Sequence, residues 1–158
     1  IGDNEYAELL KNAEKNPAEY ASLLKKGINL RETIFRIFSS VVNEKEPAPE
    51  DMHVFNTFLS ETMMNASIQY ENKSFSWKFQ AVGTPDSLFY PVIRSAADLL
   101  LSEELLRVRK CADKCCGWLF IDNSKNRSRK WCNMSDCGNR AKARRYYQRK
   151  TGKKEGQK

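Results

Sequence analysis

The sequence predicts a mainly α-helical protein with one small antiparallel β-hairpin, in which a helical domain is followed by a small treble-type zinc-binding module with a basic C-terminal helix. Three observations lead to this prediction. Apolar residues recur at helical spacing over most of residues 1–106, four cysteines form two pairs near the C-terminus, and basic residues follow the last pair. With 158 residues, the chain is long enough for one medium-sized domain and a small appendage.

Two helices are expected in the first part of the chain. The first carries apolar residues at helical spacing, namely Tyr6, Leu9, Leu10 and Ala13. The second begins after Pro17 and carries Tyr20, Leu23 and Leu24. Because glycine favours helix ends, we expect the second helix to stop at Gly27.

Two further helices follow. Residues 30–42 form a broad apolar face, and Asn29 with Glu32 is placed to cap the start of this helix. Pro47 ends that unit, and the next helix begins at residues 49–51, where proline and acidic residues suit a first turn. The apolar residues that this helix directs inward are Val54, Phe55, Phe58, Leu59 and Met63.

After Met63 the apolar residues change from helical spacing to alternation, which predicts a two-stranded hairpin near residues 66–80. Its turn lies at Asn72-Lys73, and its apolar residues are Ile68, Tyr70, Phe75, Trp77 and Phe79. An isolated hairpin is only marginally stable. We therefore expect this one to pack on the helices, with its aromatic side chains in the core rather than in a ligand pocket.

A long helix is expected over residues 87–101. The side chains that it directs inward are Leu88, Val92, Ala96, Leu99 and Leu100. Ser102-Glu103-Glu104 then starts a short helix, which leads the chain to Cys111.

The charge is divided unevenly along the chain. Residues 1–106 contain 10 Lys and Arg against 16 Asp and Glu, a net charge of −6, whereas residues 107–158 contain 17 against 4, a net charge of +13. A polyanion would be repelled by the first part and attracted by the second. We therefore predict an acidic helical domain at 1–106, a zinc module at 107–151 and a disordered basic tail at 152–158.

The cysteines indicate a metal site. Cys111 and Cys116 form one pair, Cys132 and Cys137 form the other, and fifteen residues separate the pairs. Four thiolates on two short loops suit one structural Zn²⁺ that has no open position for a substrate. Cys115 lies beside Cys116, which leaves the second ligand open between the two. Since zinc binding supplies roughly 10–16 kcal/mol of folding energy in such modules, we expect this one to unfold without metal.

All five cysteines lie within residues 111–137, which fits an intracellular metal site better than a secreted disulfide framework. The longest apolar runs are too short and too interrupted to span a membrane. We expect the protein to be cytoplasmic and to make no contact with a membrane.

The motifs around the cysteines resemble a known family. The run Cys116-Gly-Trp-Leu-Phe-x-Asp-x-Ser, followed by Arg-Lys-Trp-Cys-x-Met-x-x-Cys-Gly-Asn-Arg-x-Lys from Arg129 to Lys142, is similar to the CGNR zinc finger. The chain also resembles bacterial proteins in which this finger follows a helical domain called ABATE, described as stress-induced transcription regulators. The run from Arg94 to Ser102 is similar to the end of that domain.

The resemblance implies zinc held by Cys111, Cys116, Cys132 and Cys137, and a finger that binds DNA. Those bacterial proteins tend to carry an opening Leu-Asp-Phe-x-Asn-Thr stretch, which this sequence lacks, and the sequence does not start with methionine. We therefore expect a further segment before Ile1.

Residues 136–150 are expected to form the basic helix that contacts nucleic acid. Basic side chains of this helix and of the preceding loop are the expected phosphate contacts, and Asn139 or Arg140 would reach base edges. The full set is Lys125, Arg127, Arg129, Lys130, Asn139, Arg140, Lys142, Arg144, Arg145, Arg149 and Lys150. If about six phosphates are neutralised, affinity should fall with salt at a log–log slope of roughly −5. The alternative is a solvated basic face without a ligand.

The sequence favours a zinc-dependent DNA-binding transcription regulator whose helical body senses a signal or binds a partner. Two alternatives stay open, an RNA-binding module and a zinc-stabilised adaptor for an acidic protein surface, because the same charges fit each ligand. A single finger binds a short site weakly, so a homodimer or a second contact is expected. The sequence contains no information on the target site, the inducing signal or the direction of regulation.

Catalysis is not expected. Asp122, Ser124 and Asp136 lie among predicted turns and caps without a histidine nearby, so we predict no enzyme. The aromatic residues near the cysteines are expected to form the small core of the zinc module rather than to stack on bases. These are Trp118, Phe120 and Trp131.

Overall fold

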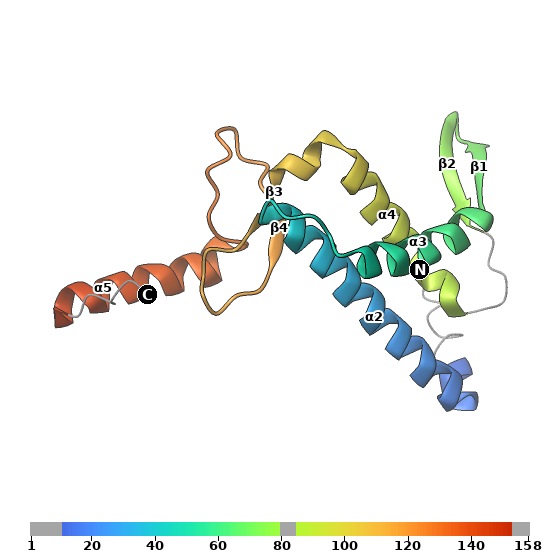
Figure 1. The fold of residues 1–158 in the computed structure, drawn as a ribbon, viewed down its shortest axis with the longest axis horizontal. Helices are drawn as coiled ribbons and strands as arrows, with labels where there is room; N and C mark the ends of the chain where they lie inside the picture. Colours follow the sequence, from blue (N-terminus) through green and yellow to red (C-terminus); the bar gives the residue numbers. More distant parts are fainter. Residues whose placement is uncertain (1–10, 80–84, 153–158) are drawn as a thin grey trace. The chain divides into compact units, whose positions relative to one another are not determined.

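The computed structural model describes residues 11–79 and 85–152 (Figure 1). It confirms the predicted class, a mainly α-helical chain with a small cysteine-rich segment near its C-terminus. Of the first predicted helix, residues 11–15 are helical and the rest lies outside the described residues, as does the predicted tail from residue 153 onward. Along the two described stretches, no helix is both long enough and apolar enough to cross a lipid bilayer.

The chain forms two compact units. The first comprises Ile1–Ile37 and Pro47–Leu101, and the second comprises Phe38–Glu46 and Ser102–Lys158. The core of the first unit is drawn from three helices and consists of Leu30, Thr33, Ile37, Phe55, Thr62, Tyr90, Ile93, Ala96 and Ala97.

Helix α2 (Pro17–Val42) is continuous, so the predicted stop at Gly27 and the predicted cap at Asn29 are both wrong (Figure 1). Gly27 lies in the helix interior, where the ring of Phe89 approaches within 3.1 Å of the place that a Cβ atom would take. The missing side chain thus admits an aromatic ring. The roughly 1 kcal/mol that a glycine costs inside a helix is offset by burial of the helix face that carries Leu30.

Helix α3 (Pro49–Met64) begins where the sequence predicts, with proline in its first turn. Only Phe55 and Thr62 of this helix are fully buried, and Met63 is exposed, contrary to the prediction. Arg36 of α2 donates through Nη2 to Asp51 Oδ1 at 2.7 Å and so links the two helices.

Strands β1 (Ala66–Glu71) and β2 (Ser74–Phe79) form the predicted antiparallel hairpin. Asn72 and Lys73 of the turn have φ angles of 52° and 60°, the left-handed values that a tight hairpin turn requires. The register pairs Ile68 with Trp77 and Tyr70 with Phe75, which places these four apolar side chains on one face.

That face of the hairpin is largely exposed, so the predicted place of Tyr70 in the core is wrong. Tyr70 and Phe75 are 62% and 74% exposed. Only the open end of the hairpin packs on α4 (Tyr90–Leu101), where the rings of Phe79 and Tyr90 are 6.1 Å apart and the Arg94 guanidinium lies 4.2 Å from the Trp77 ring. The helices thus support the base of the hairpin.

The predicted helix over residues 87–101 has two parts, a 3₁₀ turn η1 (Pro85–Phe89) followed by α4. Pro91 has no backbone N–H and cannot donate the hydrogen bond that would extend the α-helix toward Pro85. This accounts for the change from 3₁₀ turn to α-helix at Tyr90. The buried face of α4 also differs from the predicted one, because Val92 is 53% exposed while Tyr90, Ile93, Ala96 and Ala97 are buried.

In the second unit, the predicted short helix is present as η2 (Glu103–Arg107). It leads into β3 (Val108–Lys110), which pairs antiparallel with β4 (Leu119–Ile121) in a second hairpin, a pairing that the sequence does not predict. A π-turn η3 (Met134–Gly138) then leads directly into α5 (Asn139–Thr151), the predicted basic helix.

Candidate metal centre and basic helix

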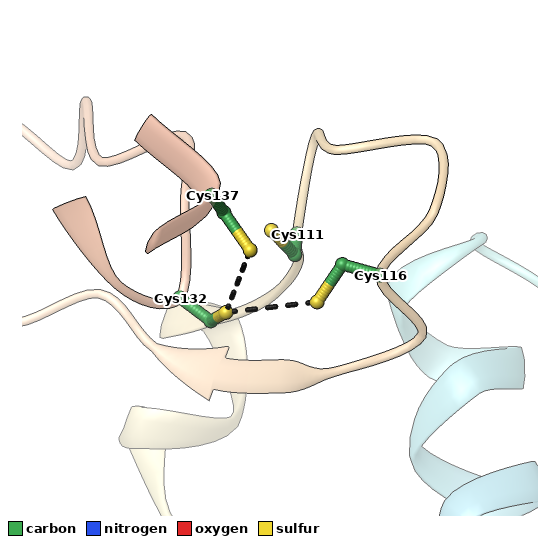
Figure 2. Close-up of side chains that lie close together, drawn as sticks. All are labelled: Cys111, Cys116, Cys132 and Cys137. Atoms are coloured by element: carbon green, nitrogen blue, oxygen red, sulfur yellow. Dashed lines mark hydrogen bonds between the residues drawn. The ribbon is translucent and has the colours of Figure 1, made fainter. Parts of the chain in front are cut away.

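The four cysteines Cys111, Cys116, Cys132 and Cys137 converge on one point (Figure 2). Their sulfur atoms all lie within 4.8 Å of one another. The Sγ atoms of Cys116 and Cys132, and those of Cys132 and Cys137, are 3.7 Å apart. Tetrahedral zinc with Zn–S bonds of about 2.3 Å requires sulfur separations of roughly 3.8 Å. One structural zinc ion therefore fits this cluster.

Each ligand is held by local structure. Cys111 follows β3, and its N–H donates to the carbonyl of Trp118 at 2.9 Å, which extends the β3–β4 hairpin to the first ligand. Cys116 lies in a turn in which its N–H donates to Asp113 O at 2.9 Å. Cys115 is exposed and outside the cluster, so of the two adjacent cysteines it is Cys116 that the cluster offers to a metal.

Cys137 lies in the π-turn that precedes α5. The Asn133 side chain caps this turn by accepting from the N–H of Ser135 at 2.8 Å, and Asn139 Nδ2 donates to Ser135 O at 2.8 Å. A Cβ atom at Gly138 would collide with Met134 Sδ, so only glycine fits there without a shift of that side chain. Each residue of the Cys-Gly-Asn run thus shapes the turn that places the fourth ligand.

The thiols differ in how readily they ionise before a metal binds. Burial opposes ionisation of Cys111, but backbone groups of Asp113 and Cys132 outweigh it and lower the pKa of Cys111 to about 7. Burial and the neighbouring Cys132 thiol raise the pKa of Cys137 to about 12. Because zinc binds thiolates, its uptake releases these protons and favours neutral or higher pH.

Arg140 lies against both the metal cluster and a buried acid. Its Nη2 donates to Cys137 Sγ at 3.0 Å and its Nε to Asp113 Oδ2 at 2.8 Å. Arg144 Nη2, one turn along α5, lies 2.6 Å from Asp113 Oδ1. Arg144 and Arg140 hold the pKa of the Asp113 carboxyl well below its usual range. The Asp113 side chain is fully buried, so α5 is fixed to the loop of the first cysteine pair.

The loop between the cysteine pairs is organised by Asp122. This buried carboxylate accepts from the N–H groups of Ser124 at 2.9 Å and Arg129 at 3.0 Å. Hydrogen bonds from Ser124 and the Arg129 backbone lower the pKa of Asp122, despite its burial. The Arg129 guanidinium in turn donates to the carbonyls of Trp131 and Cys132 and covers the Phe120 ring at 4.8 Å.

The residues predicted to contact nucleic acid fall into two groups. The first group makes contacts within the module. Hydrogen bonds hold the side chains of Arg129, Asn139, Arg140 and Arg144, and the Arg145 guanidinium lies 5.9 Å from the Trp131 ring. The remaining six are exposed, and their side chains make no hydrogen bond or ion pair among the residues that the structure describes. They are Lys125, Arg127, Lys130, Lys142, Arg149 and Lys150.

The aromatic side chains are divided as well. Phe120 and Trp131 are half-buried beneath arginines, consistent with the predicted small core. Trp118 is 72% exposed, so its predicted place in that core is wrong. It borders a surface hollow of about 380 Å³ beside the cluster. The hollow is lined by Cys116, Trp118, Cys132, Asn133, Asp136, Cys137 and Arg140.

Comparison with protein families gives one match: residues 107–150 match the CGNR zinc finger. The matched range contains all four cysteines and nearly all of α5. A comparison with curated proteins finds no match for the chain. The resemblance to this finger is therefore confirmed over these residues, whereas the resemblance of the preceding residues to the ABATE domain stays a prediction.

Proposed function

We propose that the protein is a zinc-dependent DNA-binding protein that acts in transcription regulation. The observation that carries this proposal is the joint presence, in one segment, of a four-cysteine zinc site and a net charge of +13 over residues 107–158. A charge of this size on one short segment attracts a polyanion, and phosphates are the anions that nucleic acids offer in regular array.

The metal has a structural role in this proposal. Four cysteine ligands complete a tetrahedral zinc and leave no position for a substrate or an activated water. The zinc instead replaces a hydrophobic core, since α5 has no buried residue of its own. We accordingly assign the module to binding and not to catalysis.

The helical unit has a different role. Residues 1–106 carry a net charge of −6, so this part of the chain would be repelled by nucleic acid. Its exposed apolar hairpin face suits a protein or a small ligand better than a polyanion. We propose that this unit senses a signal or binds a partner, and that dimerisation supplies the second DNA contact that a single finger needs.

RNA is the second candidate ligand. Tyr146 and Tyr147 of the basic helix α5 are 62% and 63% exposed, and Trp118 is 72% exposed. Exposed aromatic rings stack on unpaired bases, which RNA loops present and duplex DNA does not.

Competition binding tests this proposal. The zinc-loaded protein is titrated into fluorescent duplex DNA between 50 and 200 mM salt, roughly the range over which phosphate contacts change affinity most visibly. Unlabelled duplex, structured RNA and an acidic protein are then added as competitors. The proposal predicts a log–log salt slope of roughly −5 and displacement by duplex first. If RNA displaces the labelled duplex at a lower concentration than unlabelled duplex does, RNA is favoured as the ligand. If the protein binds neither polymer, both DNA and RNA are rejected as its ligands.

A further inference from the structure

We propose that the duplex lies against the outward face of α5, where Lys142, Arg149 and Lys150 bind phosphates around Tyr146, and that Arg140 and Arg144 position this helix without contacting the ligand. This inference rests on the proposed function and assigns its contact surface. It departs from the expectation that Arg140 and Arg144 also contact the nucleic acid.

The face of α5 that carries Arg140 and Arg144 already makes contacts within the module, while 54% and 40% of these side chains stay exposed. Arg140 Nε and Arg144 Nη2 lie 2.8 Å and 2.6 Å from the two carboxylate oxygens of Asp113, whose side chain is fully buried. A guanidinium that turned to a phosphate would take one of the two cations from this buried carboxylate, which is unfavourable. Arg140 would also give up its hydrogen bond to the ligand sulfur of Cys137.

The outward face is free to bind. At about 100° per residue, positions 142, 146, 149 and 150 occupy one side of the helix, away from positions 140 and 144. All four side chains are exposed, and the three basic ones make no hydrogen bond or ion pair with any described part of the chain. A phosphate therefore meets cations whose side chains no other described residue engages.

The spacing along α5 suits a duplex. Lys142 and Lys150 are eight residues apart, which corresponds to about 12 Å along a helix axis. The major groove of B-DNA is also about 12 Å wide. Cations at the two ends of this face can therefore reach phosphates on both sides of the groove, while Tyr146 lies between them, 62% exposed.

The test compares two triple variants of equal charge. One carries Lys142→Gln, Arg149→Gln and Lys150→Gln, and the control carries Lys11→Gln, Lys15→Gln and Lys25→Gln, which are exposed positions in the first unit. Duplex affinity is measured at several salt concentrations, with zinc content and thermal melting recorded for each protein.

The inference predicts that the α5 variant loses about 2.7 from the magnitude of its salt slope and on the order of 100-fold in affinity at 0.15 M salt, since three phosphate contacts are removed. Its zinc content and melting should equal those of the control, which should bind like the parent chain. An unchanged slope in the α5 variant, with the parent chain still binding duplex, overturns the assigned face and leaves the proposed function intact. Failure of the parent chain to bind duplex overturns both.

A single variant, Arg144→Gln, separates positioning from contact. We expect this variant to have a lower melting temperature and to lose zinc more easily. The salt slope of the duplex binding that remains should be unchanged. A slope reduced by about 0.9 with unaltered melting would instead identify Arg144 as a phosphate contact and contradict the inference.

Discussion

Arg140 donates from Nε to Asp113 Oδ2 at 2.8 Å, and this ion pair fixes the first turn of α5 to the loop that carries Cys111 and Cys116. The same guanidinium reaches the sulfur of Cys137. One arginine therefore links the metal cluster, a buried carboxylate and the start of the basic helix, so that the orientation of α5 depends on the integrity of the metal site.

Replacement of Asp113 by asparagine should destabilise the zinc module. The substitution preserves the shape of the side chain but removes the charge that Arg140 and Arg144 pair with. We expect the melting temperature to fall by several degrees and zinc to pass faster to a chromogenic chelator. Asp136→Asn is the matched control, because Asp136 is an exposed acid of the same module. Equal zinc release from the two variants would contradict the role given to Asp113.

Substitution of the two adjacent cysteines, Cys115 and Cys116, should have very different effects on zinc binding. Cys116→Ser removes a ligand, so we expect less than one zinc per chain and loss of the module's far-ultraviolet helix signal. Cys115→Ser should keep one zinc per chain with unchanged melting, because Cys115 lies outside the cluster. Metal analysis with circular dichroism measures both. Retention of zinc by Cys116→Ser together with its loss from Cys115→Ser would reverse the assignment.

A larger side chain at Gly27 should destabilise the first unit. The Phe89 ring lies 3.1 Å from the Cβ position at Gly27, so Gly27→Leu must displace this ring and should destabilise the first unit by roughly 1–3 kcal/mol. Ala21→Leu, an exposed position on the same helix, should change stability by less than about 0.5 kcal/mol. Urea denaturation followed by tryptophan fluorescence compares the two. Equal stability of the two variants would show that packing of the Phe89 ring does not require glycine at position 27.

The two phenylalanines of β2 should contribute unequally to the free energy of unfolding. Phe79 faces Tyr90 at 6.1 Å, so Phe79→Ala should cost roughly 1–2 kcal/mol. Phe75 is 74% exposed and contacts the Tyr70 ring within the hairpin, so Phe75→Ala should cost less than about 1 kcal/mol. Denaturation of the two variants under the same conditions measures the difference. A larger loss at Phe75 would mean that the outer part of the hairpin is buried in solution.

The sequence predicted those parts of the protein that depend on local spacing. The cysteine pairs, the first turn of α3 at Pro49 and the turn at Asn72-Lys73 are each specified by a few neighbouring residues, and the structure has them as expected. Gly27 shows the limit of such reasoning, because its role depends on Phe89, which is distant in the sequence.

The same limit applies to the module. Strands β3 and β4 are too short to show an alternating pattern, so their pairing was not predicted from the sequence. Arg140 and Arg144 have the composition of a phosphate-binding surface, and only the structure places them on Asp113. An acid between two cysteines of a pair, in a segment otherwise rich in cations, was the available signal for this contact.

The most direct test of the account is a chelator titration in which zinc content and duplex affinity are measured on the same samples at one salt concentration. The account predicts one zinc per chain at the start and a parallel loss of zinc and of DNA binding, with both restored when zinc is added back. Full DNA binding after complete removal of zinc would contradict the claim that the metal-supported module is the nucleic-acid-binding part of this protein.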